Sequence, residues 1–333
     1  MKRFFFVLLL LAGIASCTND EEHQECANAP DISGVSIDLD FVALDKQMRS
    51  INDTMQMVVL LQENPAIRDH FSSIPAFVDD TTRAASVMAM LQHPSYDSVL
   101  MDMDAQYGDY SALKEELSTA FRYLKYYYPD FQAPKVRTVL SGLYNGLYVS
   151  DSLVMIAPDY FLGEGATHQP QTYDYLKKRL IREHIVPTVI RNFSNNYNPT
   201  MVGEESMLAE MIDFGKAYYF TKAMLPCHPD QYIIQYSAQE MADVNQNKAV
   251  IWTALVQNEA LFSTDMMLKK KFLHERPNVV EIGERCPGRI GTWVGWDIVR
   301  RYMERNPDVS LEAMMKITDP MVIYNGAKYK PIN

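Results

Sequence analysis

The sequence predicts an α+β fold that is mainly helical and carries a small antiparallel sheet. Three short segments between residues 136 and 163 are rich in β-branched and aromatic residues and are separated by turn residues. After Pro170, apolar residues recur with helical spacing to the end of the chain. A small sheet followed by a run of helices is typical of α+β proteins. We therefore expect residues 36–333 to form a single α+β domain, with its N-terminal helical part packed on the rest.

The elements follow in a definite order. The strands are expected at VRTVLSG (136–142), GLYVS (146–150) and LVMIAPDYFLG (153–163), with Asn145-Gly146 and Ser150-Asp151-Ser152 as turns. The helices are expected at 111–128, at 171–194 with a bend near Pro187, at 204–223, at 237–261 behind a capping box at Ser237, at 288–306, and after a cap at Ser310.

One predicted helix carries two glycines four residues apart, Gly291 and Gly295, with indoles at Trp293 and Trp296. Small residues at this spacing allow a neighbouring element to approach closely. We expect the indoles to fill the core there, although a binding motif is the alternative.

The first residues have the composition of a secretory signal peptide. Two basic residues precede an apolar run over residues 4–11, which is too short to remain as a membrane anchor. We therefore expect residues 1–16 to be a signal peptide. LAGIASC further resembles a bacterial lipobox, in which Cys17 becomes the acylated N-terminus; a signal peptide with a chance cysteine is the alternative.

A polar segment without periodicity follows Cys17. We expect residues 17–35 to be a lipidated, flexible tether, and the membrane to be a partner through the lipid on Cys17. The acidic run Asp20–Glu22 resembles the export signal of surface lipoproteins in Bacteroidetes, and a solvated linker is the alternative.

Charge and cysteines limit the function classes. A formal net charge of −11 argues against nucleic-acid binding, which needs a phosphate-neutralising basic surface. Without Cys17, three cysteines remain, so at most one disulfide forms. Cys227 and Cys286 are the expected pair because both lie in turns that contain proline. The sequence contains no CxxC spacing, which would indicate a structural zinc site.

Arg182-Glu183-His184-Ile185-Val186 has the spacing of the zinc-protease motif His-Glu-x-x-His, with other residues at both histidine positions. The zinc motif needs two histidines at i and i+4, because this spacing puts both imidazoles on one helix face. None of the seven histidines stands four residues from another. We interpret His184 as a histidine hydrogen-bonded at a helix surface.

Glu183 falls on the apolar stripe of the predicted helix, close in angle to Leu180 and Ile190. A buried carboxylate must be protonated, ion-paired or hydrogen-bonded. Three interpretations follow: a structural ion pair with Arg289 or Lys216, a relic of a site that has lost its metal, or a catalytic carboxylate.

Five stretches occur in an order that points to a family. They are YLKKRLIREHIVP (175–187), LAEMIDFGKAYYF (208–220), IWTALVQNEALFST (251–264), PGRIGTWVGWDIVRRYMERNPDVSLEAMM (287–315) and AKYKP (327–331). From Leu143 to Lys330 the chain resembles the gliding-motility lipoprotein GldB family of Bacteroidetes. That family is similar to predicted zinc peptidases that carry an HExxH helix.

This resemblance implies a zincin-like fold with a degenerate metal site. Carried across, Arg182 and Val186 stand where the two histidine ligands would be, and Glu183 keeps the general-base position. Phe214 replaces the ligand glutamate. The implied site has no metal, no cofactor and no catalytic residues.

The resemblance further implies an outer-membrane lipoprotein that is catalytically inactive. It would act through contacts with envelope, motility or secretion proteins. One alternative is a hydrolase with Glu183 and His184 as its acid–base pair. Another is a module that binds peptides by strand addition at the edge of the sheet. The residues of that edge would be Leu153, Val154, Met155 and Ile156.

Overall fold

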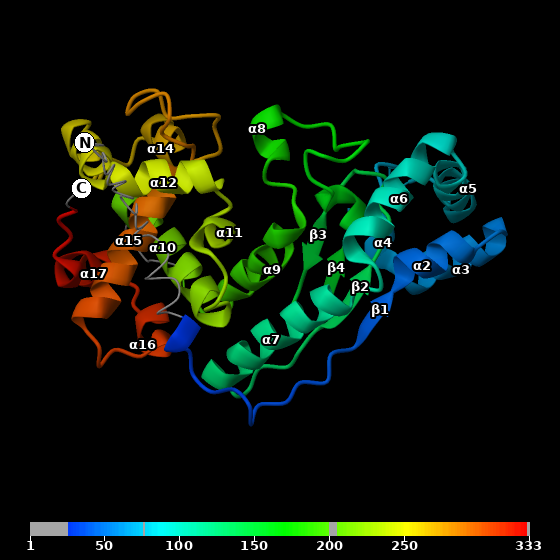
Figure 1. Cartoon of the computed structure of the whole chain (residues 1–333), viewed down its shortest axis with the longest axis horizontal. Coiled ribbons are helices and arrows are strands. Elements are labelled where there is room, and N and C mark those ends of the chain that lie inside the picture. Colours follow the sequence, from blue (N-terminus) through cyan, green and yellow to red (C-terminus); the bar gives the residue numbers. More distant parts are fainter. Residues whose placement is uncertain (1–25, 76, 200–204, 332–333) are drawn as a thin grey trace, which may run out of the picture.

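A small sheet stands in the middle of the molecule, with helices from both parts of the chain around it (Figure 1). The computed structural model describes residues 26–75, 77–199 and 205–331 of the 333-residue chain. The predicted signal peptide, Cys17 and the acidic run Asp20–Glu22 lie outside the described residues.

The sheet has four strands in the order β1-β2-β4-β3. The strands are β1 (Phe41–Ala43), β2 (Lys135–Thr138), β3 (Leu147–Val149) and β4 (Leu153–Ile156). β1 and β4 both pair with β2 in parallel, and only β3 runs antiparallel, to β4. The α+β class is confirmed, but the prediction of an antiparallel sheet is wrong: the sheet is mixed.

The loop from β2 to β3 explains the mixed pairing. It does not turn back as a hairpin but carries the chain past the position of β4 to the far edge. The buried carboxylate of Asp159 holds this loop by accepting hydrogen bonds from the backbone N–H groups of Ser141 and Leu143 and from the Tyr96 hydroxyl. Gly142 and Leu143 adopt positive φ angles of 64° and 63° there. The hairpin from β3 then returns β4 to the gap beside β2.

The predicted sheet edge at Leu153–Ile156 is therefore wrong. These residues form β4, which is paired on one side with β2 and on the other with β3. Its backbone groups are already used in the sheet, so it cannot accept another strand. The edges are β1 and β3.

β4 separates two hydrophobic clusters because its side chains alternate between the two faces of the sheet. Val154 and Ile156 face the larger cluster, whereas Met155 and Ala157 face the smaller one. The smaller cluster is covered by the N-terminal helices (Figure 1). These are α2 (Leu44–Ser50), α3 (Thr54–Glu63), α4 (Pro65–His70), α5 (Asp80–Leu91) and α6 (Pro94–Tyr107).

The larger cluster joins the other face of the sheet to the C-terminal helices. α7 (Ser111–Tyr127) packs here through Leu113, Leu117, Phe121 and Leu124, which confirms the helix predicted at 111–128. The remaining helices are α10 (Met207–Met224), α11 (Asp230–Ile234), α12 (Ala238–Gln246), α13 (Lys248–Gln257), α14 (Met266–Leu273), α15 (Ile290–Arg305), α16 (Leu311–Met315) and α17 (Pro320–Ala327).

Several sequence predictions for these helices hold. α10 and α15 form within a few residues of their predicted bounds, and Ser237 and Ser310 cap α12 and α16. The predicted helix 237–261 is wrong as one element, because the chain breaks at Asn247 between α12 and α13. Asn247 leaves helical geometry with a φ of −117° and a ψ of 22°.

The continuous helix predicted at 171–194 is also wrong. The chain forms α8 (Asp174–Lys177), a 3-10 turn (Arg182–His184) and α9 (Ile185–Ser194). Contacts with the segment after β4 hold residues 180–181 extended: Leu162 bridges to Ile181, and the Gly163 N–H donates to the Leu180 carbonyl. Pro187 lies in the first turn of α9, where its missing N–H costs nothing, so it accompanies a helix start rather than a bend.

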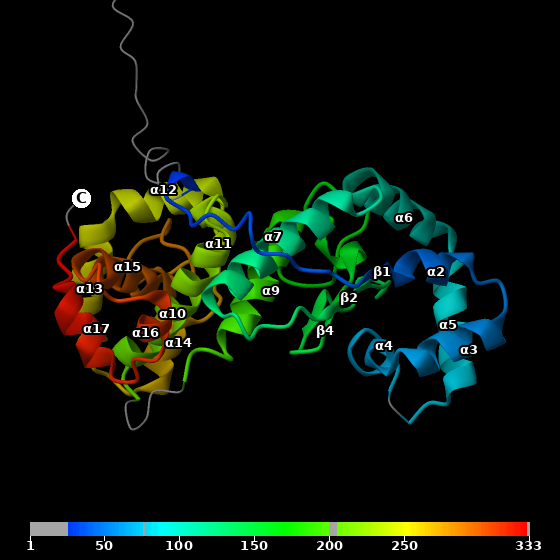
Figure 2. The ribbon, with the colours of Figure 1, turned by 90° about the horizontal axis from the view of Figure 1, so that it is seen from below.

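The disulfide joins Cys26 to Cys227, and Cys286 is a buried free thiol. The predicted Cys227–Cys286 pair is therefore wrong. From Cys26 the chain runs along α7 to β1 (Figure 2). The Arg122 side chain of α7 donates to the backbone carbonyls of Ile32 and Val35 on this path.

None of the helices in the described part of the chain has the length and hydrophobicity needed to cross a membrane.

Candidate functional site

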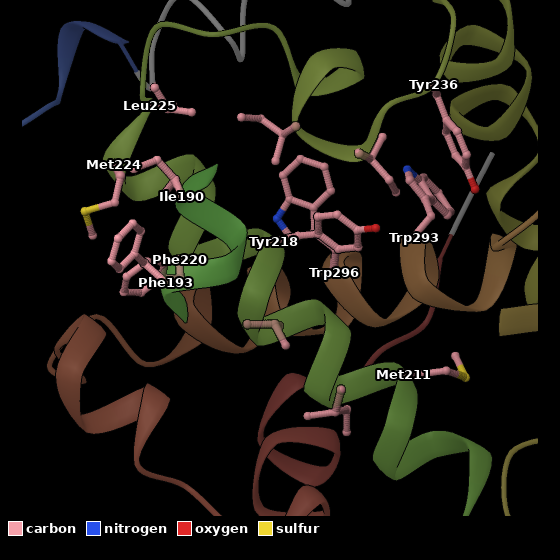
Figure 3. Packing of buried hydrophobic residues seen from close by; sticks show 14 of the residues in the cluster. Ile190, Phe193, Met211, Tyr218, Phe220, Met224, Leu225, Tyr236, Trp293 and Trp296 are labelled. Atoms are coloured by element: carbon pink, nitrogen blue, oxygen red, sulfur yellow. The ribbon is translucent and has the colours of Figure 1, made fainter. Parts of the chain in front are cut away.

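The candidate site lies where α9, α10 and the start of α15 meet. α10 and α15 approach closely because glycines face the opposite backbone. A Cβ on Gly295 would lie 1.7 Å from the Met211 carbonyl oxygen, and a Cβ on Gly215 would lie 2.3 Å from the Gly295 carbonyl oxygen. Tyr218 and Trp296 pack against each other across this contact, with ring centroids 5.7 Å apart (Figure 3). The expected close approach and the buried indoles are confirmed.

A cavity of about 600 Å³ opens beside this contact. Its lining comes from α9 and the residues after it, from α10, and from three later segments of the chain. The lining residues are Arg191, Asn192, Asn195, Asn198, Asp213, Phe214, Ala217, Tyr218, Gln235, Leu273, His274, Glu275, Arg289 and Thr292.

Three guanidinium groups surround the buried side chains of this cavity. Arg191 and Arg289 each donate to the Tyr218 hydroxyl, at 3.3 and 3.0 Å. Glu275 bridges two arginines: its oxygens lie 2.7 Å from Nε of Arg289 and 3.2 Å from Nε of Arg179. Arg289 also donates to the carbonyl of Ile234 at 2.9 Å. One carboxylate therefore serves two of the three arginines.

Electrostatics in the cavity favour anionic groups. Burial acts to raise the pKa of Tyr218, but the guanidiniums of Arg289 and Arg191 outweigh it and hold that pKa below its ordinary value. Burial acts to lower the pKa of Arg289, but Tyr218 and Glu275 keep it above its ordinary value. Arg289 is buried and adopts a left-handed conformation with a φ of 59°. Such a conformation costs about 1–2 kcal/mol in a residue with a side chain.

Asp213 and Asn198 form another part of the lining. Nδ2 of Asn198 donates to Asp213 at 2.9 Å, whereas Oδ1 of Asn198 is buried without a hydrogen-bond partner among the described residues. Desolvation raises the pKa of Asp213, against the opposing effect of Lys216. The cavity thus offers unsatisfied acceptor and donor capacity close together.

Arg182, Val186 and Phe214, the positions carried over from the zinc-peptidase pattern, lie in different surroundings in the structure. Arg182 lies in the 3-10 turn and pairs with Glu116 of α7 at 3.6 Å. Val186 is buried in the core, and only Phe214 lines the cavity. The 3-10 turn runs directly into α9, which begins at Ile185. These three positions are therefore not gathered around this cavity.

Another pair of residues with the i, i+4 spacing does line the cavity. Arg191 and Asn195 stand four residues apart at the end of α9, and both line the cavity with Phe214. Asn192 directly follows Arg191 and also lines the cavity. The sequence signal that could have found them is Pro187, because proline is favoured in the first turn of a helix, and in the helix that follows residues 191 and 195 are neighbours on the surface.

Glu183 is more exposed, and His184 more buried, than the sequence predicts. Glu183 is half-buried, and its carboxylate has no ion-pair partner among the described residues. Arg289 binds Glu275 instead, and Lys216 is fully buried and donates to the carbonyl of Ile317 at 2.7 Å. His184, expected at the surface, is 2% exposed, and its Nδ1 lies 2.8 Å from the Arg179 carbonyl.

Neither residue lines the cavity. Burial, with help from the nearby charges of Arg179 and Arg289, lowers the pKa of His184 to about 4. Its Nε2 has no hydrogen-bond partner among the described residues.

The burial of His184 makes the stability of the fold depend on pH. Unfolding restores an ordinary pKa of 6.5, so between 6.5 and 4 the unfolded chain binds a proton that the folded chain does not. Stability is therefore full above pH 6.5 and is lost as the pH falls. We expect this residue to lower the free energy of unfolding by about 2 kcal/mol between pH 7 and pH 5.

Urea denaturation at several pH values, with His184→Gln beside the wild type, measures this contribution. The variant is expected to be less stable at pH 7 but to lose less on acidification. Equal losses in the two proteins would contradict the assignment.

The fold and the site together define a mainly helical α+β protein with an arginine-lined cavity between its helices. In the described residues, no group of three or more His, Cys, Asp or Glu side chains is arranged to hold a metal ion. The family model described as gliding motility protein GldB matches residues 25–331, and the chain belongs to this family. The family's name connects the chain with lipoproteins, gliding motility and hence the cell envelope. No match was found among curated proteins or among solved structures.

Proposed function

We propose that this chain is an outer-membrane lipoprotein with a peptidase-like but catalytically silent cleft, working through protein contacts in the machinery of gliding or secretion. The membership of the GldB family supports the envelope role. The lipobox-like LAGIASC and the acidic run after it support lipidation at Cys17 and placement in the outer membrane.

One observation carries the proposal of a silent cleft. Two positions four apart, one on α9 and one at its C-cap, and a position on α10 converge on one cavity, and they hold Arg191, Asn195 and Phe214. Zinc needs deprotonated sulfur, imidazole or carboxylate ligands. A guanidinium stays protonated and a phenyl ring has no donor atom. Asn192, where the general base would stand, cannot take up a proton.

Metal binding tests this proposal directly. The full-length chain, purified in detergent without chelator or affinity histidines, is expected to contain well below one equivalent of zinc by plasma mass spectrometry. A variant with Arg191→His, Asn192→Glu, Asn195→His and Phe214→Glu is expected to bind about one zinc, because it restores three ligands around one cavity.

The matched control keeps Phe214 and changes only the three α9 residues. It lacks the third ligand and is expected to bind zinc much more weakly. Circular dichroism establishes that both variants fold. Stoichiometric zinc in the wild type, or equal zinc affinity in the two variants, would contradict the proposal.

A further inference from the structure

Arg191 is the least satisfied charge in the cavity. Its guanidinium carries five N–H donors, of which one reaches the Tyr218 hydroxyl, and the group lies over the Tyr218 ring. No carboxylate pairs with Arg191 among the described residues. Arg289 is more than nine-tenths buried, and four of its five N–H donors already point to the Tyr218 hydroxyl, two backbone carbonyls and Glu275, so the free donors are mainly those of Arg191. The cavity therefore has guanidinium donors left for a ligand.

The side chains in and around the cavity carry an excess of positive charge that one bound anion would balance. Four cationic side chains lie in or beside the cavity, those of Arg179, Arg191, Arg289 and Lys216. Three carboxylates act on them, those of Glu275, Asp213 and Glu240. One net positive charge remains in a partly buried place, where an unpaired charge is costly. A singly charged carboxylate balances it better than a doubly charged phosphate.

The remaining lining groups match a peptide. The buried Oδ1 of Asn198 lacks a donor, which a peptide N–H can supply and a phosphate dianion cannot. Phe214 is 41% exposed and, with Leu273, offers apolar surface for a side chain. The volume of about 600 Å³ lies within the range of sites for small ligands.

We propose that this cavity binds the C-terminal carboxylate of a peptide chain, with Arg191 as the carboxylate donor, the charge of Arg289 beside it, and Asn198 as the acceptor for the last peptide N–H. The occupant is thus the end of a polypeptide rather than its middle. This inference stands on the cavity alone: it needs neither the lipid anchor nor the metal-free state of the proposed function.

Calorimetry on the full-length chain in detergent tests the proposal with two peptide mixtures. One is a random tetrapeptide mixture with free C-termini, and the other is the same mixture with amidated C-termini. The free mixture is expected to bind, and the amidated mixture at least about tenfold more weakly, because a charge-assisted pair is lost. Acetate is expected to compete, and inorganic phosphate to compete no better than acetate.

Two arginine variants locate the binding. Arg191→Gln is expected to weaken binding of the free mixture at least about tenfold. Arg182→Gln removes an arginine of the 3-10 turn before the same helix, outside the cavity, and is expected to leave binding unchanged. Urea denaturation shows whether both variants keep their fold.

Absence of binding to the wild type, equal binding of free and amidated peptides, or equal effects of the two variants would overturn the proposal. Stronger competition by phosphate than by acetate would also overturn it, in favour of a phosphate site. The zinc measurements are separate, so either proposal can fail without the other.

Discussion

Replacing Cys26 by serine is expected to lower the free energy of unfolding by about 5 kcal/mol. The bond between Cys26 and Cys227 closes a loop with a sequence separation of 201 residues. A cross-link stabilises the fold mainly by restricting the unfolded chain, and the effect grows with the logarithm of loop length. This is the largest single contribution that we expect from any covalent or non-covalent contact in the molecule.

The measurement is urea denaturation in two parallel series. One contains dithiothreitol, which reduces the disulfide, and the other does not. Wild type is expected to lose stability on reduction, whereas Cys26→Ser is expected to be insensitive to the reductant. Cys286→Ser is the matched control, since it removes a buried thiol but leaves the disulfide intact. A variant as stable as the oxidised wild type would contradict the expectation.

The disulfide also has a local consequence. The segment after Cys26 is held at α7 by two hydrogen bonds from Arg122 and by the buried side chains of Ile32 and Leu39. These contacts lie beyond the cross-link, toward β1. Hydrogen exchange in Cys26→Ser should therefore rise at the start of this segment, around residues 26–30, and much less in β1.

Local signals in the sequence located most of the helices. The Ser237 capping box, the Ser310 cap and the apolar stripe of α7 each depend on residues within a few positions of one another. Such signals predict the folded structure well because the contacts that they depend on form within the helix itself. The family resemblance likewise agrees with the family match over residues 25–331.

The errors arise where distant residues decide the local structure. The helix predicted at 171–194 is broken by the bridge from Ile181 to Leu162. The sheet is mixed because the β2–β3 loop is held across the sheet by Asp159, which follows β4. Cysteine pairing could not be deduced from spacing, since Cys26 lies far along the chain from Cys227.

The cavity was missed for the same reason. Its guanidiniums come from Arg191 and Arg289, and its carboxylate comes from Glu275, which also pairs with Arg179. The helical wheel of the predicted helix 171–194 instead places Glu183 on the apolar stripe, whereas α9 begins only at Ile185. Once the start of α9 is known, Arg191 and Asn195 fall on the surface that faces Phe214. The site therefore depends on one helix boundary that only tertiary contacts define.

Gly295→Ala is expected to lower the free energy of unfolding by about 3 kcal/mol or more. The added Cβ would lie 1.7 Å from the Met211 carbonyl oxygen, and that atom belongs to the backbone of α10. No side-chain rotation can relieve this contact, so α10 and α15 must separate along a buried interface. Alanine improves helix propensity by about 1 kcal/mol, which is too little to offset the clash.

A graded series of glycine variants tests the explanation. At Gly291 the nearest atom is the Leu273 Cδ2 at 2.8 Å, which is a side-chain atom that can move, so Gly291→Ala should cost less. Gly165→Ala is the control, since nothing lies within 4 Å of its Cβ position. Urea midpoints that do not rank Gly165, Gly291 and Gly295 in this order would contradict the role of close backbone approach.

The same variant connects the interface to the cavity. α10 supplies Tyr218 and Phe214, and the N-cap of α15 supplies Arg289, so the contact at Gly295 fixes the distance between the two sides. Separation of the helices would lengthen the bond from Arg289 to the Tyr218 hydroxyl, which is 3.0 Å in the native packing. Gly295→Ala should therefore weaken peptide binding even where the variant remains folded, whereas Gly165→Ala should leave it unchanged.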